Sequence, residues 1–424
     1  MKYCYYVILF LVLWIIPEVF IIKRLSAYGK LDDLLVVLLI VYMVIKLIFN
    51  LQFKISSFNM LFSLYLVSIV GSILLSDSIG IHSLTATLLF IKPWVIILFL
   101  NQYKYGDLIN SIKNAINIML GVGLINLIVV LSLRIIIGSS YDQDNAKGIM
   151  GNAHYAGEYI YMLLLFSYYQ IIEKNRYLYM IIVILGFFGL LITETTQLII
   201  FAFLSPLIFV FIKMKLNLIK VVQGTIISTV FVLILFLSLR SNSILITQFY
   251  RVQEVALDIE NLTDFMALEM LFNDNAEFRN NYFIFGAGPG NFGSRVGAGR
   301  NTPLYNKYME PLNWINQDSG TINDPNNQIQ TIMSELGLFG LTGFMLLIIF
   351  MLFHIIKFNK IKKGYELLYY LFIGEFFQIC SRFLVEDVFF MNNSLLIILF
   401  IFPLIYKMNN EFNFQNKKIR ESLG

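Results

Sequence analysis

The sequence predicts an all-α polytopic membrane protein with about 12 transmembrane helices and one large extracytoplasmic loop between helices 9 and 10. Two observations lead to this fold class. Hydrophobic residues make up 58% of the 424 residues and charged residues only 14%, whereas a soluble globular protein carries about 25% charged residues. Apolar runs of roughly 20 residues, the length that crosses a bilayer, also recur along the chain. Most of the surface must therefore face lipid.

The apolar runs set the expected order of the helices. They fall near 3–22, 33–51, 58–75, 84–100, 114–137, 156–173, 218–239, 327–354, 364–382 and 388–406. The stretch 177–212 is too long for one crossing, and the polar run from Thr193 to Gln197 divides it. We expect two short helices joined by a tight turn there. The first run lacks a small-residue cleavage pattern, so we expect it to be retained as a helix.

Three parts of the chain follow from this order. We expect helices 1–9 in residues 1–239, the large extracytoplasmic loop in 240–326, and helices 10–12 with a cytoplasmic tail in 327–424. Lysine and arginine in the short loops concentrate on the side of the N-terminus, for example at Lys174, Arg176 and Lys213. The positive-inside rule then places both termini in the cytoplasm of a multi-pass protein of the cytoplasmic membrane.

Arginine has the opposite bias from lysine. Most arginines lie at or beyond the expected outer face, namely Arg24, Arg134, Arg240, Arg251, Arg279, Arg295, Arg300 and Arg382. The guanidinium fork suits bidentate binding of phosphate and carboxylate, whereas lysine is sufficient for topology. We therefore expect a phosphate-bearing ligand at the outer face. The alternative is that these arginines decorate an ordinary solvated loop.

The extracytoplasmic loop divides by charge. Residues 252–278 contain acids and no base, and Val255, Ile259, Leu262 and Met266 recur at helical spacing. This pattern predicts an amphipathic helix on the membrane or over a site, or alternatively a solvated acidic helix face. Residues 279–309 contain bases and no acid, and they include GAGPGNFGSRVGAG. Glycines offer backbone N–H groups to an anion, so we expect a diphosphate or acidic-sugar contact there.

Other features limit the function. Lys92 lies mid-span, where a charge either forms a polar groove for a lipid headgroup or is paired within the bundle. The two cysteines lie in apolar runs and the three histidines are far apart in sequence. We therefore expect no metal site and no cofactor. The net charge of +4 gives no reason to expect nucleic acid as a partner.

Three segments resemble the O-antigen ligase and polymerase superfamily, the membrane glycosyltransferases of Wzy and WaaL type. In DPNNQIQTIMSELGLFGLTGF, Asn326-Asn327 precede Gly337-Leu338-Phe339-Gly340, with Glu335 just before. This resembles a family signature in which a His-Asn pair is followed by a Gly-x-x-Gly element. GAGPGNF resembles the family's GxGxGxF element. KGIMGNAHYAGEY, before the sixth span, resembles its Gly-Asn-rich segment.

The chain departs from the family pattern at two positions. Asn326 stands where the family has histidine, and asparagine cannot act as a base. Thr196 stands where an arginine is expected after the seventh span. Because ligases of the superfamily depend on that histidine, the resemblance favours a polymerase of O-antigen or capsular repeat units. An O-antigen-type ligase, and a lipid-linked-oligosaccharide flippase or polysaccharide transporter, are the alternatives. We found no internal repeat of the kind that transporters commonly show.

The resemblance implies a reaction and its partners. A growing glycan would pass from undecaprenyl diphosphate to a sugar hydroxyl of an incoming lipid-linked repeat unit at the outer face of the membrane. Donor and acceptor are both carrier-linked glycans, membrane lipid surrounds them, and a chain-length regulator protein is a further candidate partner. The protein must stabilise the leaving diphosphate and accept a proton.

Candidate site residues follow from those demands. Asp324 is the expected catalytic base, with His154 and Glu158 as competitors and Asp318 behind them, although Asp324-Pro325 also suits a helix cap. The expected catalytic arginines are Arg279, Arg295 and Arg300. The expected substrate-binding residues are Arg251, Lys147, His154, Asn326, Asn327, Glu335, Arg382, Gly288 and Gly290. Glu335 lies two helical turns after Gln328, so both should face the interior of the bundle.

Overall fold

A computed structural model describes residues 31–49, 56–76, 79–138, 146–150, 153–193, 195–213, 276–292, 304, 307, 315–316, 321–322, 328–359, 364–382 and 398–410. Its helices are α2 (Leu31–Ile48), α3 (Ser57–Leu74), α4 (Ile81–Leu100), α5 (Tyr105–Ile137), α6 (Ala153–Ile172), η5 (Tyr177–Tyr179), α7 (Met180–Thr193), α8 (Thr196–Lys213), α12 (Ala276–Tyr282), α15 (Gln328–Phe358) and α16 (Glu366–Arg382). Residues 398–410 are also helical. Strands β1 (Ile315–Asn316) and β2 (Thr321–Ile322) pair antiparallel, with Ile315 opposite Ile322.

The helical membrane class is confirmed in its coarse form. Among the described residues, 4 helices (α3, α4, α5 and α15) are long and apolar enough to cross a membrane. The predicted division of 177–212 is also confirmed, because α7 ends at Thr193 and α8 begins at Thr196. The runs 3–22 and 218–239, the acidic segment up to residue 275 and most of the loop 240–326 lie outside the described residues. Twelve crossings, cytoplasmic termini and the three-part division stay predictions.

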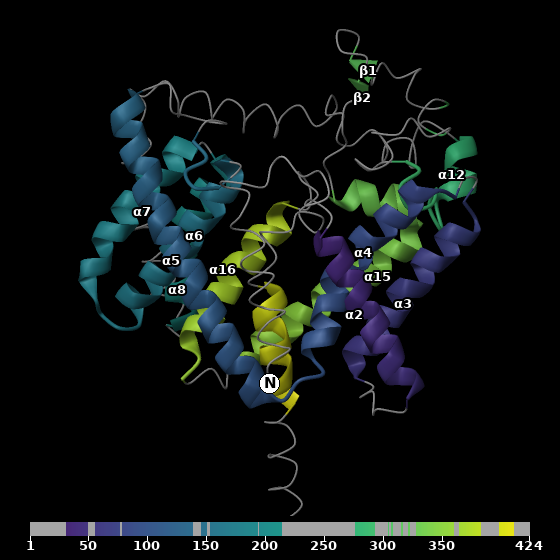
Figure 1. Ribbon diagram of the computed structural model, residues 1–424, viewed down its shortest axis with the longest axis horizontal. Helices are drawn as coiled ribbons and strands as arrows, with labels where there is room; N and C mark the ends of the chain where they lie inside the picture. Colours follow the sequence, from purple (N-terminus) through teal and green to yellow (C-terminus); the bar gives the residue numbers. More distant parts are fainter. Residues whose placement is uncertain are drawn as a thin grey trace, which may run out of the picture.

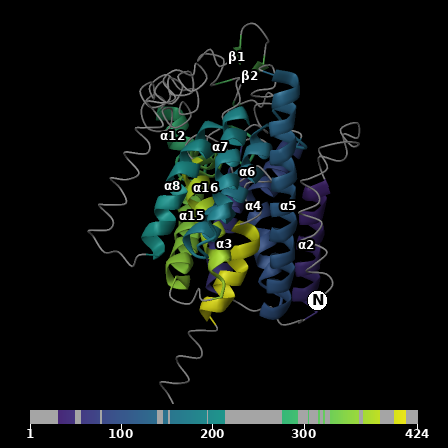
Figure 2. The same cartoon turned by 90° about the vertical axis from the view of Figure 1, so that its left-hand side faces the viewer.

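The described helices form two groups (Figure 1). In one group α6 packs against α5, α7 and α8, and in the other α15 packs against α3 while α2 packs against α4. Helix α16 packs on α6 and α8 and lies between the groups in the view of Figure 1. Figure 2 shows that the helices run alongside one another, with α12 and the two strands at one end of the bundle.

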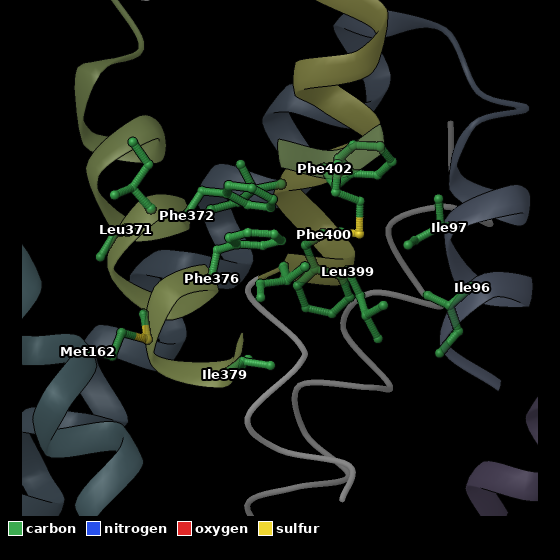
Figure 3. Packing of buried hydrophobic residues seen from close by; sticks show 14 of the residues in the cluster. Ile96, Ile97, Met162, Leu371, Phe372, Phe376, Ile379, Leu399, Phe400 and Phe402 are labelled. Atoms are coloured by element: carbon green, nitrogen blue, oxygen red, sulfur yellow. The ribbon is translucent and has the colours of Figure 1, made fainter. Parts of the chain in front are cut away.

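Aromatic side chains join the two groups. Phe402, in the helix 398–410, lies 5.9 Å from Phe58 of α3 and 6.4 Å from Phe372 of α16, measured between ring centroids. Figure 3 shows Phe402 beside Phe372 of α16, with Ile96 and Ile97 of α4 on the other side. The outward faces instead carry exposed apolar residues such as Leu38 and Ile128. An apolar exterior around an aromatic interior is what a lipid-embedded helix bundle requires.

Helix α15 contains a break that the apolar pattern did not predict. Gly337 has φ 68° and ψ −171°, so the helix stops before it and a second helical segment starts after it. Only glycine adopts such angles readily, because it has no Cβ. The segment that follows α12 contacts the break, since Leu338 donates to the carbonyl of Phe283, and Figure 1 shows α12 near one end of the bundle.

Candidate functional site

Polar side chains gather where α15 breaks. We call this group the break cluster; it consists of Ser72, Ser76, His82, Asn291, Ser334 and Glu335. A helix break leaves backbone carbonyls before it and N–H groups after it without partners in the helix. Such groups are costly at membrane depth unless the protein satisfies them. At this break the partners come from the loop 283–292, which contains GAGPGNF.

The carbonyls before the break accept hydrogen bonds from that loop. The backbone N–H of Ala287 donates to the carbonyl of Ser334 over 2.8 Å, and that of Gly288 donates to the carbonyl of Glu335 over 3.0 Å. The hydroxyl of Ser72, from α3, also donates to the Glu335 carbonyl over 2.5 Å. These contacts join the loop and α3 to the last turn before the break.

The N–H groups after the break donate to the same loop. Leu338 donates to the carbonyl of Phe283 over 2.8 Å, and Phe339 donates to the carbonyl of Ile284 over 3.1 Å. The loop therefore satisfies both sides of the interruption. The loop 283–292 and the part of α15 around Gly337 are distant in sequence but form one structural unit.

Two glycines allow this close approach. Gly286 has φ 74°, and a Cβ there would lie 2.3 Å from the carbonyl carbon of Glu335. At Gly337, with φ 68°, a Cβ would lie 2.3 Å from the carbonyl oxygen of Ile284. Both positions need glycine for their backbone conformation and for the space, since no side chain fits at these distances.

Glu335 lies at the centre of the break cluster. Its side chain is fully buried, as is that of Gln328, but residues 330–336 are all buried as well, so a face shared by these two side chains stays a prediction. Carboxylate oxygen Oε2 accepts a hydrogen bond from the N–H of Gly290 over 2.7 Å. The glycine-rich loop was expected to hold an anion, and in this structure its Gly290 N–H binds the carboxyl group of Glu335 from the same chain. A contact of Gly288 or Gly290 with a diphosphate stays a prediction.

His82 and Asn291 belong to the cluster, and sequence reasoning missed both. The amide Nδ2 of Asn291 donates to Ser76 Oγ over 2.6 Å and to the carbonyl of Ala287 over 3.1 Å. Its Oδ1 lies 2.8 Å from His82 Nε2. Asn291 stands within GAGPGNF, which could have drawn attention to it. No local signal marks His82, because its partner is 209 residues away.

A second polar group lies at the start of α6. We call it the α6 cluster; it consists of His154, Glu158, Thr193 and Thr195. His154 Nε2 and Glu158 Oε1 are 3.7 Å apart, and the two threonine hydroxyls are 3.2 Å apart. A Cβ at Gly157 would lie 2.6 Å from Thr195 Oγ1, so α6 packs tightly on the turn between α7 and α8. The segment KGIMGNAHYAGEY thus meets the turn that contains Thr195.

Lys147 lies in the strip 146–150 beside this cluster. Asn126 of α5 holds the strip, because its Oδ1 accepts from the N–H of Ile149 over 2.9 Å. The same side chain donates through Nδ2 to the carbonyl of Ala156 over 3.2 Å. Lys147 is half-buried there. One buried asparagine therefore positions both the strip and the first turn of α6.

The remaining predicted residues are less well defined. Arg279 is exposed on α12, and near it Lys307 forms an exposed ion pair of 2.8 Å with Glu277. Arg382 is the last residue of α16, and Lys92 is buried in α4. Six further candidates lie outside the described residues: Arg251, Arg295, Arg300, Asp324, Asn326 and Asn327. Convergence of the arginines on one site stays a prediction.

Comparison with known proteins identifies no family: no protein-family model matches the chain, and no curated protein is significantly similar to its sequence.

Proposed function

We propose that this protein is a membrane glycosyltransferase that polymerises undecaprenyl-diphosphate-linked oligosaccharide repeat units at the outer face of the cytoplasmic membrane. The supporting observation is the pairing of the break in α15 with the loop 283–292. Each of these segments resembles a motif of the O-antigen ligase and polymerase superfamily, and backbone hydrogen bonds join them on both sides of Gly337. Chance matches would have no reason to meet in space.

The proposed reaction makes three demands on the protein: it must hold two substrates, stabilise the departing charge and accept the proton of the attacking hydroxyl. A sugar hydroxyl attacks the anomeric carbon of the donor glycan, the bond from that carbon to the phosphate oxygen breaks, and the electron pair leaves on the diphosphate. Arg279, Arg295 and Arg300 would stabilise the departing charge. Lys147, Arg251 and Arg382 would hold the two carrier diphosphates, with Asn326 and Asn327 at the glycan. Positioning two lipid-linked substrates supplies much of the remaining acceleration.

The break in α15 is also the observation that favours a transporter. Transporters commonly build substrate sites from interrupted helices whose freed backbone groups face the substrate. In this protein, the groups freed at Ser334, Glu335, Leu338 and Phe339 bind the loop 283–292. A break filled by the chain itself supports a fixed scaffold more than a transport site. The polymerase is therefore the proposal that we prefer.

Reconstitution tests the proposal. Purified protein in vesicles would receive carrier-linked single repeat units, extracted from a strain that lacks its gene. A polymerase makes a ladder of longer glycans, a ligase makes product only with a second acceptor, and a flippase moves the substrate without lengthening it. A wild-type protein that lengthens nothing would overturn the proposal.

Arginine substitutions test the diphosphate contacts within the same assay. We expect at least one of Arg279→Lys, Arg295→Lys or Arg300→Lys to reduce polymerisation by about two to three decades, because an ammonium does not replace a bidentate fork. Lys307→Gln is the matched control, since its exposed ion pair should contribute less than about 1 kcal/mol. Normal ladders from all three lysine variants, at unchanged protein levels, would show that these arginines are ordinary loop surface.

A further inference from the structure

We propose that His82 is the catalytic base of this reaction and that Asn291 is the positioning residue that keeps its Nδ1 available for the proton. The inference rests on the proposed function and goes beyond it, because the sequence pointed to Asp324 as the base. His82 is the second residue of α4 and its side chain is half-buried at the edge of the break cluster.

The hydrogen bonds of Asn291 determine which ring nitrogen of His82 carries the proton. The carbonyl oxygen of Ala287 can only accept, so the amide atom 3.1 Å from it must be the donating Nδ2. The other amide atom is then Oδ1, which can only accept. His82 Nε2, 2.8 Å from Oδ1, must therefore donate. In a neutral imidazole this leaves the lone pair on Nδ1.

The surroundings hold the ring in this orientation. Asn291 is itself buried, and its second Nδ2 hydrogen is used by Ser76 Oγ at 2.6 Å. A Cβ at Gly80 would lie 2.9 Å from His82 Nδ1, so the missing side chain leaves room beside that nitrogen. Within the part of the chain that the structure describes, the ring of His82 forms its hydrogen bond through Nε2 and not through Nδ1.

The proton balance of the step is simple. The acceptor hydroxyl forms a bond to the anomeric carbon of the donor as the carbon–oxygen bond to the diphosphate breaks. The leaving diphosphate takes the electron pair of the broken bond. The hydroxyl proton passes to His82 Nδ1, giving an imidazolium that still donates through Nε2 to Asn291. Loss of the proton to water restores the base.

The tautomer can be measured without any substrate. The chain has 3 histidines, so protein labelled with ¹⁵N-histidine gives few ring signals, and single His→Gln variants assign them. We expect His82 to show a protonated Nε2 and an unprotonated Nδ1 in its neutral form. Asn291→Ala should produce a mixture of the two tautomers. A wild-type His82 protonated at Nδ1 would overturn the assignment.

Activity separates this inference from the proposed function. In the reconstituted assay we expect His82→Gln, whose amide can still donate to Asn291, to lower the polymerisation rate about 10²- to 10⁴-fold. The KM for carrier-linked glycan should change little. Thr85→Ala is the control, because the hydroxyl of Thr85 bonds only within α4, to the carbonyl of Ile81. If the wild type polymerises and His82→Gln matches it, the inference fails while the function stands. If the wild-type protein does not polymerise, the proposed function fails, and this inference fails with it.

Discussion

The break cluster and the α6 cluster lie at the same end of the bundle but are built differently. Helix α4 runs away from the break cluster and α5 runs back, so α6 starts at the end where α15 breaks (Figure 1). In the break cluster, the hydrogen bonds that join α3, α4, α15 and the loop 283–292 are 2.5 to 3.1 Å long. In the α6 cluster, His154 Nε2 and Glu158 Oε1 are 3.7 Å apart.

The difference in contact distance suggests that polar groups serve two purposes in this membrane protein, to hold the backbone in place and to bind a ligand. The backbone groups freed at Ser334, Glu335, Leu338 and Phe339 each have a partner in the loop 283–292, so the break cluster fixes one backbone arrangement. Hydrogen bonds between buried groups contribute such rigidity because the surroundings have a low dielectric. The His154–Glu158 pair is looser, and the ring of His154 is partly exposed. We expect the backbone contacts of the break cluster to govern folding, with His82 at its edge as the proposed base, and the α6 cluster to govern binding.

The largest effect should come from a methyl group in the break. Gly286→Ala adds a Cβ 2.3 Å from the Glu335 carbonyl carbon at φ 74°. The left-handed conformation costs an alanine roughly 1–2 kcal/mol, and overpacking adds about 1–3 kcal/mol. We expect much less folded protein in detergent, measured by gel filtration and thermal unfolding.

Gly121→Ala is the matched control for that substitution. Gly121 lies inside α5, and a Cβ there would meet nothing within 4 Å. Alanine should stabilise that helix by about 1 kcal/mol. Equal thermal midpoints for the two variants would mean that the loop 283–292 does not hold α15 as described.

The sequence predicted the helices better than it predicted the contacts of the break cluster. Apolar length located most described helices, and the polar run at Thr193–Gln197 correctly divided α7 from α8. It did not find the break at Gly337, because the apolar pattern of α15 continues across it. GAGPGNF was recognised as an anion-binding loop, but its partner within the chain, Glu335, was not. Neither was His82, since contacts between distant segments leave no mark on local composition.

A smaller effect is expected from Glu335→Gln. The substitution keeps the shape of the side chain but removes the negative charge that the N–H of Gly290 contacts at 2.7 Å. Charge-assisted hydrogen bonds contribute about 1.5–3 kcal/mol, of which a neutral amide oxygen retains part. We expect the thermal midpoint in detergent to fall measurably, though less than for Gly286→Ala. A midpoint unchanged or raised would show that the buried carboxylate is retained for a reason other than stability.

The smallest effect on stability should come from Glu158→Gln, which tests the α6 cluster. His154 Nε2 lies 3.7 Å from Glu158 Oε1, which is too far for a hydrogen bond, so this contact should contribute little to stability. We therefore expect the free energy of unfolding to stay within about 1 kcal/mol of wild type. The thermal midpoint should then lie well above that of Glu335→Gln. If the α6 cluster faces substrate, the same variant should still shorten the glycan ladder or raise KM. A fall in stability equal to that of Glu335→Gln would remove the distinction, because both clusters would then be structural.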